Sequence, residues 1–127
     1  ICVYSGFERR VIRALSRELP DLRSELDALV ERLWDLLKVV EANYYHPDLR
    51  GSFSIKQVLP VLVPEMGYED LAIADGREAS IAYARSLDCG SDSERRHIHD
   101  ALSEYCRRDT LAMLALRRAL AQKAKGL

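Results

Sequence analysis

The stretch that decides the fold is Leu102-Ser-Glu-Tyr-Cys-Arg-Arg-Asp-Thr-Leu-Ala-Met-Leu114, near the end of the 127-residue chain. Projected at about 100° per residue, residues 98–120 form a helix with one apolar face. Within roughly 60° of one line lie Ile98, Leu102, Tyr105, Ala112, Met113, Leu116 and Leu120. Asp109 falls on the same face, whereas the other charged residues of the segment lie off it. The sequence therefore predicts a long amphipathic helix with one carboxylate in its apolar stripe.

Asp109 needs a partner, because an ionised carboxylate taken out of water is costly unless it is paired, hydrogen-bonded or bound to a cation. Two interpretations follow. In the first, the helix breaks and Asp109 caps a second helix, accepting from the backbone N–H of Leu111 or Ala112. In the second, Asp109 is a metal-binding carboxylate at the edge of an active site, with Tyr105 one turn before it on the same face.

Composition limits the classes of protein that fit. At 48% hydrophobic content, the chain can bury one core, so residues 1–127 are expected to form a single domain or domain fragment. A net charge of −1 argues against a protein that coats nucleic acid by bulk electrostatics, although it leaves a local basic patch open. Three widely spaced cysteines, with no C-x-x-C pair, favour a reducing cytoplasm. No apolar run approaches the roughly 18 residues of a bilayer span, and no signal peptide is visible, so no membrane partner is expected.

The chain opens on Ile1-Cys-Val-Tyr4, which predicts a strand whose neighbours lie upstream in a longer protein. Ser5-Gly6 then predicts a turn, followed by a helix over Phe7–Leu19 that Pro20 ends. Glu8 lies near the centre of the apolar arc of this helix, either because the helix dipole favours it there or because it has a functional role. The opposite face carries four arginines: Arg9, Arg10, Arg13 and Arg17.

The rest of the chain predicts mostly helices. Helical spacing or caps indicate them at residues 21–33, from residue 54 to before Pro64, at residues 77–87, and from Ser91 onward. Residues 34–40 suit a strand or a helix, and residues 43–54 are rich in turn formers. The predicted fold class is α+β, mostly α, with a few short strands.

Several patterns resemble the DEDD superfamily of 3′-to-5′ exonucleases, in its tyrosine-bearing branch. Tyr105-x-x-x-Asp109 on a late helix is similar to the last motif. Val3-Tyr4-Ser5-Gly6-Phe7-Glu8 resembles the second motif, with Glu8 standing where the superfamily usually has Asp. Asp35-Leu36 resembles the short strand that follows, and Ser54-Ile55-Lys56 resembles a helix cap beside the substrate groove. The first motif, Asp-x-Glu, has no credible match in this chain.

More specifically, the chain resembles a bacterial family of uncharacterised domains found in larger nucleases. The resemblance spans nearly the whole chain and is carried by Tyr45-His-Pro-Asp-Leu-Arg-Gly-Ser-Phe-Ser-Ile-Lys56, Leu59-Pro60, Asp75-Gly76 and Tyr105-Cys-Arg-Arg-Asp-Thr110. It implies an RNase H-like exonuclease fold of which this chain is the later, C-terminal part.

The resemblance also implies a site. Mg²⁺ or Mn²⁺ would be bound by Asp109 and Glu8 in a two-metal arrangement, and Tyr105 would orient the attacking water. Tyr105 would act as a base only with a pKa well below its usual value near 10. Arg108, Arg50 and Lys56 would contact the phosphates of the substrate, although for Arg50 and Lys56 the alternative of solvated surface charges stays open.

Two hypotheses of function remain at this stage. In one, the chain is part of a metal-dependent nuclease acting on DNA or RNA, inactive alone because it lacks Asp-x-Glu. In the other, it is a non-catalytic helical interaction or scaffolding module of a larger nucleic-acid-processing protein. An apolar surface left exposed without the upstream part of the polypeptide would favour self-association.

Overall fold

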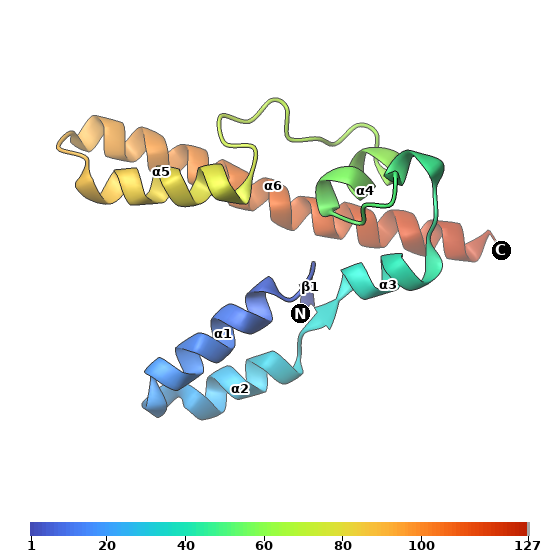
Figure 1. The fold of residues 1–127 in the computed structure, drawn as a ribbon, viewed down its shortest axis with the longest axis horizontal. Coiled ribbons are helices and arrows are strands. Elements are labelled where there is room, and N and C mark those ends of the chain that lie inside the picture. The colour runs from blue at the N-terminus through green and yellow to red at the C-terminus, as the bar shows by residue number, and fades with distance from the viewer. Residues whose placement is uncertain (127) are drawn as a thin grey trace. The chain divides into compact units, whose positions relative to one another are not determined.

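The computed structural model describes residues 1–126, and its contacts divide the chain into two compact units, Ile1–Val61 and Leu62–Leu127 (Figure 1). Both are built mainly of helices, and the only strands among the described residues are two short parallel ones. The predicted α+β class with mostly α structure is therefore confirmed, whereas the RNase H-like relationship and the single domain stay predictions.

The first unit begins with a parallel strand pair that encloses a helical hairpin. Cys2 pairs with Trp34 and Val3 with Asp35. In the sequence, α1 and α2 come between the two strands, and they lie side by side in the structure (Figure 1). The buried Ser16 of α1 donates a hydrogen bond of 2.9 Å to Asp27 of α2. In order, the elements are β1 (Cys2–Val3), α1 (Phe7–Glu18), η1 (Pro20–Leu22), α2 (Arg23–Glu31), β2 (Trp34–Asp35), α3 (Leu36–Asn43), η2 (Pro47–Leu49) and α4 (Ile55–Leu62).

Local chemistry explains where the predicted boundaries hold and where they fail. The first helix ends as predicted before Pro20, with Leu19 as its C-cap. The helix predicted at residues 21–33 begins later than expected, because proline at the first position sets a 3₁₀ turn over Pro20–Leu22 and Leu22 occupies the N-cap of α2. The ambiguous residues 34–40 contain both alternatives, a two-residue strand followed directly by α3.

The second unit contains a long helical hairpin preceded by an irregular segment, residues 63–75. The helices α5 (Gly76–Asp88) and α6 (Asp92–Lys125) pack against each other (Figure 1). Each begins with a side-chain cap: Asp75 accepts from the N–H of Glu78 at 2.8 Å, and Ser91 from that of Glu94 at 3.4 Å. The helix predicted at residues 77–87 is confirmed with one further residue at each end, and the helix predicted from Ser91 begins with Ser91 as its cap.

The helix α6 runs unbroken for 34 residues, so the interpretation of Asp109 as the cap of a second helix is wrong. The predicted stripe is confirmed: every one of its residues, Asp109 included, is buried or half-buried, and Ala112 and Leu116 have no exposed surface. Asp109 therefore occupies a helix interior, where its side chain must find a partner outside the helix backbone.

No helix within residues 1–126 combines the length and the apolar character needed to cross a membrane.

Candidate functional site

The candidate site of the second unit is built around Asp109 on α6. Tyr105 precedes Asp109 by one helical turn, so both side chains leave the same face of α6. Both are half-buried. The sequence prediction that these two residues lie together is confirmed by the continuous helix.

Tyr68 is the partner of Asp109 that the sequence did not reveal. Its hydroxyl donates a hydrogen bond of 2.7 Å to Oδ1 of Asp109, and its side chain is buried, with 6% exposure. The rings of Tyr68 and Tyr105 lie 6.3 Å apart, tilted by 50°. Because Tyr68 lies 41 residues before Asp109 in an irregular segment, no periodic pattern links them. The only sequence signal is an aromatic residue in a turn-rich stretch.

The two tyrosines stay neutral at ordinary pH. Burial, followed by the hydrogen bond and the charge of Asp109, raises the pKa of Tyr68 far above its usual value. Burial, together with the charge and the hydrogen bonding of Asp109, raises the pKa of Tyr105 to about 12. A general-base role for Tyr105 is therefore disfavoured, and both hydroxyls can serve as hydrogen-bond donors.

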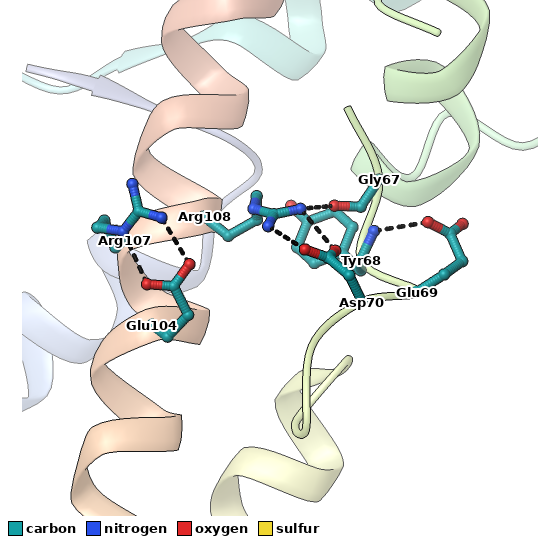
Figure 2. A network of polar contacts seen from close by, with 7 residues as sticks. All are labelled: Gly67, Tyr68, Glu69, Asp70, Glu104, Arg107 and Arg108. Atoms are coloured by element: carbon teal, nitrogen blue, oxygen red, sulfur yellow. Dashed lines mark hydrogen bonds and ion pairs between the residues drawn. The ribbon is translucent and has the colours of Figure 1, made fainter. Parts of the chain in front are cut away.

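An arginine clamp holds the same irregular segment to α6 (Figure 2). The guanidinium of Arg108 donates to both carboxylate oxygens of Asp70, at 2.9 and 2.7 Å, and also to the carbonyl oxygen of Gly67. The bidentate bond to Arg108 lowers the pKa of the Asp70 carboxyl. Asp70 thus compensates the charge of Arg108, and the predicted contact of Arg108 with phosphate stays a prediction.

Glu8 lies in the first turn of α1, and its Oε2 atom is buried with no hydrogen-bond partner among residues 1–126. The turn before it is fixed by Asp35, whose Oδ1 accepts from the backbone N–H of Ser5 at 2.9 Å and from that of Leu37 at 3.0 Å. Ser5 has a positive φ of 78°, a backbone conformation that residues other than glycine rarely adopt. Asp35 therefore shapes the turn that positions Glu8.

The remaining predicted residues are on the surface of the first unit. Arg50 is exposed, and its backbone adopts the left-handed conformation, with φ 50°, at the C-cap of η2. Lys56 is exposed in the first turn of α4. Glu8, Arg50 and Lys56 belong to the first unit, and the other predicted residues to the second. Joint action of the two sets stays a prediction.

The donor chemistry of Glu8 and Asp109 fits a hard divalent cation, because carboxylate oxygens are the ligands that Mg²⁺ and Mn²⁺ prefer. Within residues 1–126, no three or more His, Cys, Asp or Glu side chains gather in a way that could hold a metal ion. Two carboxylates are fewer than a two-metal hydrolytic site uses. A complete site of that kind would therefore require further acidic ligands.

Residues 1–54 match the model of a family described as a domain of unknown function, DUF2779. This match includes Glu8, Asp35 and Arg50, and it leaves Lys56, Tyr105 and Asp109 outside. No curated protein and no solved structure matches the chain significantly. A domain of unknown function is thus supported over residues 1–54, whereas a resemblance over nearly the whole chain and the nuclease relationship stay hypotheses.

Proposed function

We propose that this chain is part of a metal-dependent nuclease that hydrolyses phosphodiester bonds of DNA or RNA, with Mg²⁺ or Mn²⁺ bound by Glu8 and Asp109. The observation that carries the proposal is the buried Oε2 atom of Glu8, which has no hydrogen-bond partner within residues 1–126. A buried carboxylate oxygen without a donor loses its hydration and gains nothing in exchange. A cation is the partner that most directly compensates such an oxygen.

The surroundings of Asp109 suit the second ligand. Its Oδ1 accepts from Tyr68, which fixes the rotation of the carboxylate while the group remains an acceptor. A ligand whose orientation is set by such a hydrogen bond binds a metal more tightly than a freely rotating one. Tyr68 would therefore position the carboxylate in the proposed site.

Tyr105 would orient the attacking water by donating or accepting a hydrogen bond. Since its pKa is raised to about 12, its hydroxyl keeps its proton at neutral pH. The bound metal would supply activation of the water and stabilisation of the leaving oxygen. Arg50, Lys56 and, after release from Asp70, Arg108 would contact the phosphates of the substrate.

Two carboxylates alone give little or no activity, so the proposal includes acidic ligands from an Asp-x-Glu strand in another part of the polypeptide. Catalysis would then be a property of the assembled protein, with this chain contributing the helix that carries Tyr105 and Asp109.

The proposal is tested by calorimetric titration of the chain with Mn²⁺. Glu8→Gln and Asp109→Asn each remove one negative oxygen while keeping size, and Asp88→Asn at the exposed end of α5 is the matched control. Removing a residue that only orients a metal ligand weakens metal binding by roughly tenfold or more. Removing a ligand itself should weaken Mn²⁺ binding by at least as much. Equal affinity in all four proteins would contradict the proposal.

A non-catalytic interaction or scaffolding module is the second candidate, and the Tyr68–Asp109 hydrogen bond favours it. A carboxylate that already accepts from a buried hydroxyl needs no cation for stability. In that case Mn²⁺ does not bind, whereas Asp109→Asn still lowers the free energy of unfolding. The two functions are thus separated by one titration and one unfolding experiment.

A further inference from the structure

The helix α1 has a basic face that no ion pair within residues 1–126 neutralises. At about 100° per residue, Arg9, Arg10, Arg13 and Arg17 fall within an arc of roughly 100°, and both glutamates of the helix lie outside that arc. Arg10, Arg13 and Arg17 are exposed, and Arg9 is half-buried. This basic face, defined by the four arginines, stands out in a chain with a net charge of only −1.

The arginines of the basic face differ from several of those on α5 and α6. Arg85, Arg107 and Arg108 are each paired with a carboxylate. None of the four on α1 forms an ion pair within residues 1–126, and the recorded contact of Arg10 is with the ring of Phe7, 5.4 Å from its guanidinium carbon. Like charges three or four residues apart destabilise an isolated helix. The basic face therefore lowers the stability of α1, and a bound anion would relieve the repulsion between its guanidinium groups.

We propose that the basic face of α1 binds the phosphate backbone of a single-stranded nucleic acid. Arg9, Arg13 and Arg17 follow one another at intervals of one turn, about 6 Å, and so form a row along the helix. Guanidinium groups donate two parallel hydrogen bonds to phosphate oxygens, a geometry that lysine does not offer.

An exposed aromatic ring next to the row favours a single strand. Phe7 is 58% exposed and lies beside Arg10 at the beginning of α1. Surfaces that bind single strands combine a positive track for the backbone with aromatic or guanidinium planes on which bases stack. Phe7 and Arg10 provide such a pair at one end of the basic face.

A membrane surface is the competing partner, because α1 also exposes Phe7, Val11 and Leu15. On the helical projection, however, Glu18 lies within the stripe formed by these three residues, and Glu8 lies inside the wider apolar arc that also includes Ile12 and Leu19. Insertion of the stripe into lipid would bring both carboxylates toward the hydrocarbon, which is costly. The charge distribution therefore favours nucleic acid over lipid.

The inference requires neither Glu8 nor a metal ion, so it can fail or succeed independently of the proposed function. Binding of a labelled single-stranded oligonucleotide is measured by fluorescence anisotropy in EDTA, with DNA and RNA of mixed sequence. Four phosphate contacts predict a salt slope of about −3, and hence an affinity loss of about 50-fold between 50 and 200 mM salt.

The decisive comparison is between two double variants that remove the same charge. Arg13→Gln with Arg17→Gln should reduce the salt slope by about 1.4 and weaken binding by about tenfold or more at 50 mM salt. Arg117→Gln with Arg118→Gln, on exposed positions of α6, should leave both values unchanged. Circular dichroism establishes that both variants keep their helices, as expected because glutamine is a good helix former.

The inference is overturned if wild-type chain does not bind the oligonucleotide at 50 mM salt, or if both double variants weaken binding equally. It is also overturned if the chain sediments with anionic phosphatidylserine vesicles and the α1 double variant loses that binding while oligonucleotide binding is unaffected.

Discussion

The hydroxyl of Tyr68 carries the strongest single prediction about the second unit. Tyr68→Phe removes one oxygen and leaves the ring that packs 6.3 Å from the ring of Tyr105. The change therefore isolates the hydrogen bond of 2.7 Å to Asp109 from the packing of the side chain. Its effect measures how far Asp109 depends on this one donor.

The expected loss follows from the charge and the burial of the pair. A hydrogen bond to a charged group contributes about 1.5–3 kcal/mol, and Tyr68 is only 6% exposed. Asp109 is half-buried, so water can replace part of the lost donor. We therefore expect the free energy of unfolding to fall by about 2 kcal/mol, toward the middle of that range.

Urea unfolding followed by far-UV circular dichroism measures this loss, because the helices of the second unit contribute to that signal, whereas the single tryptophan, Trp34, belongs to the first unit. Tyr83→Phe is the matched control, since Tyr83 lies 56% exposed on α5 of the same unit. The control should change the free energy of unfolding by less than about 0.5 kcal/mol. If Tyr68→Phe and Tyr83→Phe have equal effects, the hydrogen bond does not stabilise the unit and the reasoning is refuted.

Three further predictions concern other contacts. Asp35→Ala should lower the free energy of unfolding by about 1 kcal/mol or more, because it removes the cap of α3 and the acceptor for the N–H of Ser5. Asp35→Asn keeps an acceptor oxygen, so it should retain most of the wild-type stability. Urea unfolding followed by Trp34 fluorescence distinguishes the two variants. Arg108→Gln and Asp70→Asn should each accelerate amide hydrogen exchange in residues 67–71. The double variant should add little to Arg108→Gln, since that change already removes both the ion pair and the bond to Gly67. Tyr105 has a pKa near 10 unfolded and about 12 folded, so its contribution to stability is complete below pH 10 and is lost as pH rises toward 12; Tyr105→Phe should flatten that part of the decline in urea midpoints measured between about pH 9 and pH 12.

Periodic patterns were sufficient to predict most of the helices. The apolar stripe of α6 and the side-chain cap before it are local features, and each appears in the structure close to the predicted residues. Proline gave the end of α1 for the same local reason. Local steric and hydrogen-bonding rules act over a few residues, so the features that they produce can be recognised in the sequence alone.

The parallel strand pair shows where such rules end. Residues 34–40 were ambiguous because two strand residues leave no measurable alternation, and helix spacing begins immediately after them. The pairing of Val3 with Asp35 depends on a contact across 32 positions, together with one carboxylate that bonds two backbone N–H groups. Neither feature has a periodic signature.

Only the part of the candidate site that lies on one helix could be predicted from the sequence. The interval between Tyr105 and Asp109 gives their common face directly. The need of Asp109 for a partner was also deducible from electrostatics, but the identity of that partner, Tyr68, was not, because residues 63–75 form no regular element. The same holds for Asp70, whose pairing with Arg108 depends on how this segment runs past α6.

The central proposal, that Glu8 and Asp109 are ligands of a divalent cation, is tested most directly by NMR of the isotope-labelled chain during addition of substoichiometric Mn²⁺. The account predicts that paramagnetic broadening appears first at the amides around Glu8 and around Asp109, and that Asp109→Asn abolishes it around residue 109. Broadening confined to exposed carboxylates elsewhere, or unchanged in Asp109→Asn, would contradict it.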